Sequence, residues 1–132
     1  ARCKPEKGDV LLSKNGTVGV AKAIDWDYEF SIFVSLALLK PDKKRIYPKY
    51  LELYLNSDGG QMQAKAHSKS GTVTNLHLNE IKQFKIPLPP IAKQKELAEA
   101  ISAEQVIIEQ NKIIIRNYED RISRKLSAIW GE

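Results

Sequence analysis

The chain has 132 residues, of which 42% are hydrophobic and 28% are charged, and it carries a formal net charge of +5 at neutral pH. This composition predicts a folded domain with a modest core and excludes a globally disordered chain. No apolar run approaches the roughly 20 residues that a membrane span requires, and the charged first ten residues do not resemble a signal peptide.

The first predicted element is a β-hairpin. Val10–Leu12 reads as a short apolar strand, and the alternating residues Val18–Ile24 read as its partner. Asn15-Gly16 between them predicts a tight turn, because both residue types tolerate positive φ. Phe30–Leu39 is nearly all apolar, so we expect it to form a buried central strand.

Short helices follow. Pro48 is favourable in a first helical turn, and it is followed by an apolar face made of Tyr50, Leu51, Tyr54 and Leu55. We expect this helix to end within residues 56–60 and a short polar helix to cover residues 61–68.

The end of the domain is predicted from its turn and proline signals. Residues 70–75 read as a loop that leads into a short strand. Asn79 is a candidate cap for a brief helix over residues 80–83. The proline-rich residues 84–90 read as a final strand, in which proline blocks further pairing.

From Ala92 to Ile129 the pattern is that of one uninterrupted helix. About 40 residues at roughly 1.5 Å each give a rod near 60 Å long. Its apolar stripe has spacings of three, four or seven and consists of Leu97, Ile101, Ile108, Ile115, Tyr118, Ile122 and Ile129. Such a stripe needs a partner helix, and Asn111 within it could fix the register. The alternative is a helix that lies across its own domain.

Charge is distributed unevenly along the chain. Residues 1–90 hold 14 Lys or Arg against 9 Asp or Glu, whereas residues 91–132 hold 7 of each. We therefore divide the chain into a basic domain over residues 1–90 and a helix over residues 91–132. We expect the domain to bind a polyanion and the helix to bind protein. An ordinary basic surface is the alternative.

No set of residues predicts catalysis. The two histidines lack metal-ligand spacing, and neither a P-loop nor a nucleophile elbow occurs. Asp42, Glu80 and Lys82 resemble the carboxylate-plus-lysine pattern of many metal-dependent nucleases. A turn explains Asp42 better, and a helix start, where an acidic residue is favoured, explains Glu80 better. We expect no enzyme activity, cofactor or metal. The single cysteine, Cys3, cannot form an internal disulfide and favours a cytoplasmic location.

Two polar clusters are the candidate DNA-binding residues. One comprises Lys65, His67, Ser68, Lys69, Thr72, Thr74 and Asn75, and the other comprises Lys14, Asn15 and Thr17. The expected division is that Lys14, Lys65 and Lys69 contact phosphates, while His67, Ser68, Thr72, Thr74 and Asn75 lie near base edges. Solvated loops are the alternative interpretation of each cluster.

Three segments in order carry a family resemblance: GDVLLSKNGTVG at 8–19, SGTVTNLHLNEIKQFKIPLPP at 70–90, and Gln94. Together they resemble the specificity subunit of type I restriction-modification systems. In that family a Gly-x-x-x-x-Leu loop and a short helix close a target-recognition domain. An Ile-Pro-Leu-Pro-Pro segment and a long helix entered through a Gln-bearing turn follow. Gly71, Leu76, Ile86–Pro90 and Gln94 match these places.

The resemblance implies an α+β fold: a small, mostly antiparallel recognition domain followed by one long coiled-coil-type helix. It implies recognition of one half of a split DNA target, with the helix as spacer and with partner subunits that methylate or cleave. The resemblance implies that a full subunit contains two such domains and two such helices. We therefore expect this chain to be a fragment or a half-unit whose domain lacks its N-terminal part. The partner of the helix is then a second conserved helix or a second copy.

Two other classes of function stay open at this point. The chain could be the recognition-plus-helix tail of a single-chain methyltransferase or nuclease, or a coiled-coil interaction protein without a DNA role. A preference for particular DNA sequences in the intact complex would distinguish a specificity subunit from a protein whose basic surface binds DNA without specificity.

Overall fold

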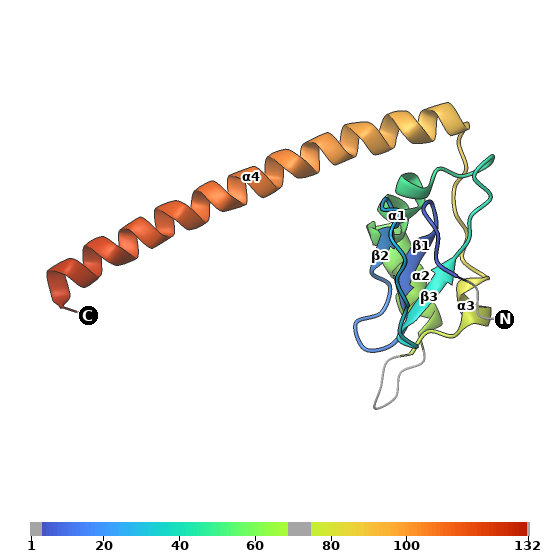
Figure 1. Cartoon of the computed structure of the whole chain (residues 1–132), viewed down its shortest axis with the longest axis horizontal. Coiled ribbons are helices and arrows are strands. Elements are labelled where there is room, and N and C mark those ends of the chain that lie inside the picture. The colour runs from blue at the N-terminus through green and yellow to red at the C-terminus, as the bar shows by residue number, and fades with distance from the viewer. Residues whose placement is uncertain (1–3, 69–74, 132) are drawn as a thin grey trace. The chain divides into compact units, whose positions relative to one another are not determined.

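The computed structural model describes residues 4–68 and 75–131. Its elements in chain order are β1 (Val10–Ser13), β2 (Ala21–Ala23), β3 (Leu36–Leu39), α1 (Pro48–Asn56), α2 (Asp58–His67), α3 (Leu78–Ile81) and α4 (Ile91–Trp130) (Figure 1). The chain forms two compact units, the first ending at Ala98 and the second holding the rest of α4. The α+β class with a small antiparallel sheet and a long helix is confirmed.

The sheet is antiparallel throughout and has the order β2-β1-β3. Val10 pairs with Ala23 on one side and with Leu39 on the other, so β1 is the central strand. The prediction that residues 30–39 form a buried central strand is wrong, because only Leu36–Leu39 is a strand and it lies at an edge. Phe33, within the predicted strand, is 80% exposed.

The predicted hairpin is confirmed, but its tight turn is not. Residues 14–20 connect β1 to β2, and Gly16 has a positive φ of 73° whereas Asn15 does not. The prediction of a tight turn with positive φ at both Asn15 and Gly16 is therefore wrong. Ser13 closes the loop instead, since its N–H donates to the Val20 carbonyl and its hydroxyl accepts from the Val20 N–H, both at 2.9 Å.

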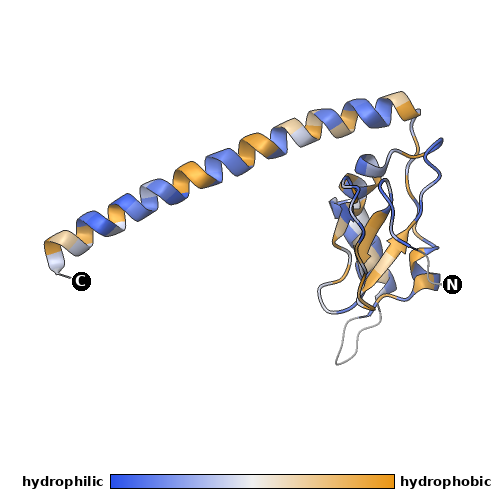
Figure 2. Ribbon diagram, viewed as in Figure 1, coloured by the Kyte–Doolittle hydropathy of each residue, from blue (hydrophilic) through white to orange (hydrophobic). Residues whose placement is uncertain are grey.

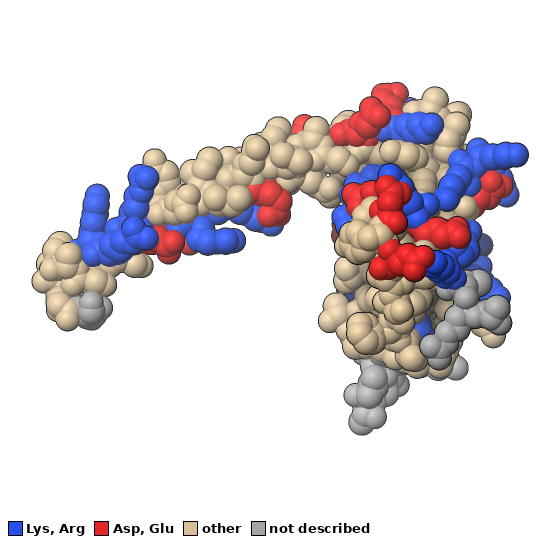
Figure 3. Space-filling model, in the orientation of Figure 1, with Lys and Arg blue, Asp and Glu red and all other residues tan. Residues whose placement is uncertain are grey.

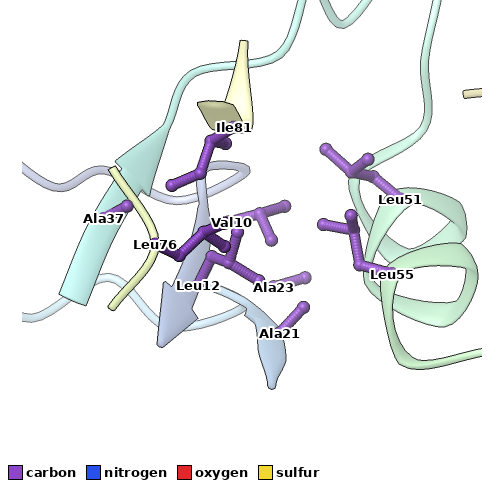
Figure 4. Packing of buried hydrophobic residues seen from close by; sticks show 9 residues of the cluster. All are labelled: Val10, Leu12, Ala21, Ala23, Ala37, Leu51, Leu55, Leu76 and Ile81. Atoms are coloured by element: carbon purple, nitrogen blue, oxygen red, sulfur yellow. The ribbon is translucent and has the colours of Figure 1, made fainter. Parts of the chain in front are cut away.

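The core lies between the sheet and α1. Its buried side chains are Val10, Leu12, Ala21, Ala23, Ala37, Leu51, Leu55, Leu76 and Ile81 (Figure 4). Two polar side chains of α1 also bind the outer backbone of β2. Asn56 pairs with both the N–H and the carbonyl of Ala21, at 2.8 and 2.9 Å, and the buried Glu52 carboxylate accepts from the Ala23 N–H at 2.7 Å. These side chains therefore supply pairing that a fourth strand would otherwise give.

Pro48 begins α1 as predicted, but α2 begins earlier than predicted. Ser57 precedes α2 and its hydroxyl accepts from the Gly60 N–H, so the helix starts at Asp58 rather than at residue 61. A Cβ at Gly60 would collide with the backbone carbonyl of Tyr54. Glycine is therefore required here for the close approach of two helix ends, not to end a helix.

The end of the domain also differs from the sequence prediction. The residue before α3 is His77, whose N–H donates to Glu80 at 2.7 Å, so Asn79 is inside the helix and is not its cap. Residues 84–90 form no strand. The Gln63 side chain accepts from the Lys85 N–H at 2.8 Å and donates to the Lys85 carbonyl at 2.9 Å, which replaces strand pairing.

A buried glutamine joins the start of α4 to the domain. Gln94 is 0% exposed. Its side-chain oxygen accepts from the Tyr47 N–H at 2.9 Å, and its side-chain nitrogen donates to the carbonyls of Arg45 at 2.9 Å and Pro89 at 2.8 Å. The first two turns of α4 therefore belong to the compact domain, which agrees with the burial of Ala98.

The helix α4 is continuous from Ile91 to Trp130, which confirms the predicted long helix over Ala92–Ile129. Apolar and polar residues alternate along it (Figure 2). Every member of the predicted stripe is exposed in the single chain, from 36% at Leu97 to 75% at Ile129. None of the described helices is long and apolar enough to span a bilayer.

Candidate nucleic-acid interface

The β1–β2 loop and the segment before α3 lie side by side. Asn15 forms an isolated antiparallel bridge with Asn75. The adjacent Leu76 N–H donates to the Lys14 carbonyl at 2.7 Å, and the Leu76 side chain is fully buried. Candidate residues from both sequence clusters, far apart in the chain, are therefore brought together by backbone pairing.

The helix α2 supports this loop from one side. Gly19 has a φ of +86°, and a Cβ placed on it would lie 2.9 Å from the Ala64 side chain. Gln61 donates from its side-chain nitrogen to the Gly19 carbonyl at 2.7 Å. The C-terminal turn of α2, with Lys65 and His67, consequently follows directly after the contact with the loop. Sequence reasoning missed Gln61 and the steric role of Gly19, because neither carries a local signal.

The predicted residues at the end of α2 are partly engaged inside the domain. The His67 ring lies 5.7 Å from the Phe84 ring, centroid to centroid. The Ser68 hydroxyl donates to the Lys65 carbonyl at 3.1 Å. Lys65 itself is exposed, as are Asn15 and Thr17 on the neighbouring loop. Lys69, Thr72 and Thr74 lie outside the described residues.

Ion pairing divides the lysines of the domain into two groups. Lys40 lies 2.7 Å from the buried carboxylate of Asp9, and this hydrogen bond raises the pKa of Lys40 above its ordinary value. Lys49 forms an ion pair with Glu52 at 2.6 Å. Within residues 4–68 and 75–131, by contrast, no Asp or Glu pairs with Lys14 or Lys65. These two cations remain available to an external anion.

The resulting surface combines unpaired cations with amide and hydroxyl side chains at one end of a small sheet. Lysines there can neutralise phosphates, and the amides of Asn15 and Asn75 can each donate and accept toward a base edge. Among the described residues, no group of three or more His, Cys, Asp or Glu side chains could hold a metal ion.

A family model described as the type I restriction modification DNA specificity domain matches residues 2–116. The chain is 29% identical over 100 residues to the type I restriction enzyme EcoBI specificity subunit of Escherichia coli, covering 76% of this chain and 21% of that protein. It is 33% identical over 101 residues to the putative type I restriction enzyme MjaX specificity subunit of Methanocaldococcus jannaschii, covering 72% and 24%.

Two solved structures share the fold. One is the HsdS subunit from Thermoanaerobacter tengcongensis, with a TM-score of 0.68 and 19% identity over 81% of this chain and 28% of that one. The other is the type I restriction-modification system S subunit from M. genitalium, with a TM-score of 0.63 and 17% identity over 83% and 29%. The chain thus spans about a quarter of the length of these relatives.

Proposed function

The chain belongs to the type I restriction-modification DNA specificity family, and on that premise we propose that it recognises one half of a split DNA target. The observation that carries this proposal is the match over residues 2–116, which includes the whole domain and more than half of α4. Residues that resemble the family's motifs also lie at the proposed surface, since Leu76 anchors the segment that carries Asn75.

In this proposal the loop end of the domain lies at the bases that are read. Lys14, Lys65 and Lys69 contact phosphates and fix the position of the domain, while the shorter polar side chains lie near base edges. Asn15 and Asn75 are the best placed of these, because their backbones are paired and their side chains therefore start from a defined position. An Asn amide matches the donor and acceptor pattern of adenine in the major groove.

Methylation-site mapping of the assembled enzyme tests this function. Asn15→Ala and Asn75→Ala should each change the preference at particular bases by about 1–3 kcal/mol. Asn117→Ala, at an exposed position of α4, is the matched control and should leave the target unchanged. If the loop variants methylate the same target at the same rate as the wild type, the reading surface is placed wrongly.

The chain itself holds no catalytic set in this proposal, so methylation and cleavage belong to partner subunits in the cytoplasm. Val106 and Ile113 support an additional protein contact. At about 100° per residue they lie on roughly the opposite side of α4 from Ile108 and Ile115, and they are 56% and 54% exposed. A helix that is apolar on several sides is normally buried on several sides.

The main stripe of α4 is proposed to pack against a second helix in antiparallel orientation. Residues 91–110 carry four acidic and two basic side chains, whereas residues 111–131 carry two acidic and five basic ones. Antiparallel pairing places the acidic half of one helix against the basic half of the other, which favours this orientation over the parallel one. The partner is a second conserved helix of the full subunit or a second copy of this chain.

Sedimentation of the isolated chain tests the pairing. Ile108→Asp with Ile115→Asp should convert an assembled species into a monomer, because the interface would bury unpaired charges. Val106→Asp with Ile113→Asp, on the other side of the helix, should leave the assembly intact. A monomeric wild type would overturn the proposed self-pairing.

A further inference from the structure

A second group of cations lies at the end of the sheet opposite to the β1–β2 loop (residues 14–20), which we call the reading loop. Ser13 pairs with Leu36 at one end, and Val10 pairs with Leu39 at the other. The reading loop follows Ser13, whereas the turn that contains Lys43, Lys44 and Arg45 follows Leu39 (Figure 1). We name Lys43, Lys44, Arg45 and Lys95 the junction patch. Figure 3 shows Lys and Arg side chains at this end of the domain, with Asp and Glu side chains beside them.

The junction patch is built on a fixed turn. Asp42 accepts from the Lys44 N–H with its side chain at 3.0 Å and from the Arg45 N–H with its carbonyl at 2.9 Å. Gln94 then binds the Arg45 carbonyl at 2.9 Å, which places the next residue of α4, Lys95, beside this turn. The backbone positions from which these cations extend are therefore fixed.

The cations of the patch form no ion pairs within the described chain. All four cations are exposed, and Asp42 is the acidic residue within the turn itself. No carboxylate in the described part of the chain pairs with Lys43, Lys44, Arg45 or Lys95. Lys43 donates to a backbone carbonyl, that of Lys7 at 3.0 Å, and Lys95 lies 5.8 Å from the centre of the Tyr47 ring. Their positive charge is thus presented to solvent.

The character of this surface favours a polyanion over an acidic protein. Protein interfaces use large apolar or aromatic anchors in their centres. Within residues 35–61 no large apolar side chain is exposed, and the nearest exposed ones on either side of Lys95 in the sequence are Leu88 at 46% and Leu97 at 36%, of which Leu97 belongs to the stripe of α4. Exposed Lys and Arg side chains without a carboxylate partner are what phosphate contacts require.

We propose that the junction patch binds the DNA phosphate backbone outside the bases that the reading loop contacts. This inference rests on the proposed DNA recognition. The three residue steps that separate the two ends of β1 span about 10 Å. With the duplex lying along β1, that distance corresponds to about three phosphates of one strand, which follow one another at about 3.4 Å of helix axis. The patch therefore adds affinity and orientation without adding sequence preference.

The test uses the assembled enzyme and duplex DNA that carries its target. Lys44→Ala with Arg45→Ala should lower the slope of log affinity against log salt by about two, at roughly 0.9 per lost phosphate contact. Affinity should fall equally for target and non-target duplexes, and the methylated sequence should not change. The matched control, Lys44→Arg with Arg45→Lys, preserves both charges and should preserve the slope.

Phosphate-ethylation interference locates the contact. Phosphates outside the recognised bases should interfere in the wild type and cease to interfere in the double alanine variant. An unchanged salt slope with intact target selection would contradict the phosphate contacts of the junction patch and would leave the proposed function unaffected. Loss of subunit assembly with an unchanged slope would also contradict these contacts, in favour of an acidic protein partner. Absence of target selection in the wild-type complex would instead contradict the proposed function.

Discussion

Replacing Gln94 by Met is the sharpest perturbation of the junction between the domain and α4. Methionine has nearly the same volume, so the change removes hydrogen bonds with little change in packing. Three bonds of 2.8–2.9 Å are lost from a side chain that is 0% exposed. At a net value of about 1 kcal/mol each, the free energy of unfolding should fall by about 3 kcal/mol.

Urea titration followed by Trp26 fluorescence measures this loss, with Trp130 replaced by Phe so that the signal reports on the domain alone. Gln110→Met, at an exposed position of the same helix, is the matched control and should change stability by less than about 0.5 kcal/mol. Hydrogen exchange adds a local readout, because the Tyr47 N–H should lose protection in the Gln94 variant. Equal stability of Gln94→Met and the wild type would refute the role of Gln94 in joining the two elements.

Other predictions address the reading loop and the ion pairs. Gly19→Ala should destabilise the domain by roughly 1–3 kcal/mol more than Gly16→Ala in thermal unfolding, since both have positive φ but only Gly19 lies against a neighbouring helix. The isolated chain should bind duplex DNA with a dissociation constant on the order of 10⁻⁴ to 10⁻⁶ M, and Lys14→Ala with Lys65→Ala should lower its salt slope by about two without altering preference; an unchanged slope would contradict their phosphate contacts. The carboxylate partner of Lys40 raises the pKa of this lysine when folded. The contribution of this ion pair to the free energy of unfolding is therefore complete below about pH 10 and is lost as pH rises through the folded-state pKa of Lys40. In urea titrations the free energies of unfolding of the wild type and Lys40→Met should therefore become equal at high pH.

Features set by local sequence were predictable. Pro48 marks a helix start because its ring fixes φ and its missing N–H has no cost there. The long helix was predictable because its apolar spacing continues without proline or glycine from Ile91 until Gly131. The pairing of β1 with β2 followed from alternation on both sides of a turn signal.

Features set by tertiary contacts were not predictable. Phe30–Leu39 has strand composition, but the centre of the sheet is taken by β1, and residues 26–30 stack as an aromatic group with Trp26 and Phe30 5.4 Å apart. The Asn-Gly signal was overridden by Ser13, which binds Val20 and widens the loop. Residues 84–90 read as a strand, yet a side-chain amide from α2 supplies their pairing.

The candidate surface likewise has features that were predictable from the sequence and features that depend on tertiary contacts. The residue types were visible in the sequence, and the resemblance gave a reason to connect them. The adjacency of Asn15 and Asn75 depends on a backbone bridge between distant segments, so no local pattern could reveal it. The support from Gln61 and Gly19 likewise exists only once α2 is packed against the loop.

A domain transplant tests whether this domain reads one half of the target. Residues 1–90 would be replaced by the corresponding segment of the Escherichia coli relative while α4 is kept, and the methylated sequences of the two assembled enzymes would be mapped. We expect one half of the split target to change to a new sequence and the other half to stay the same. An unchanged target, or a change in both halves, would contradict the claim that this domain reads one half-site.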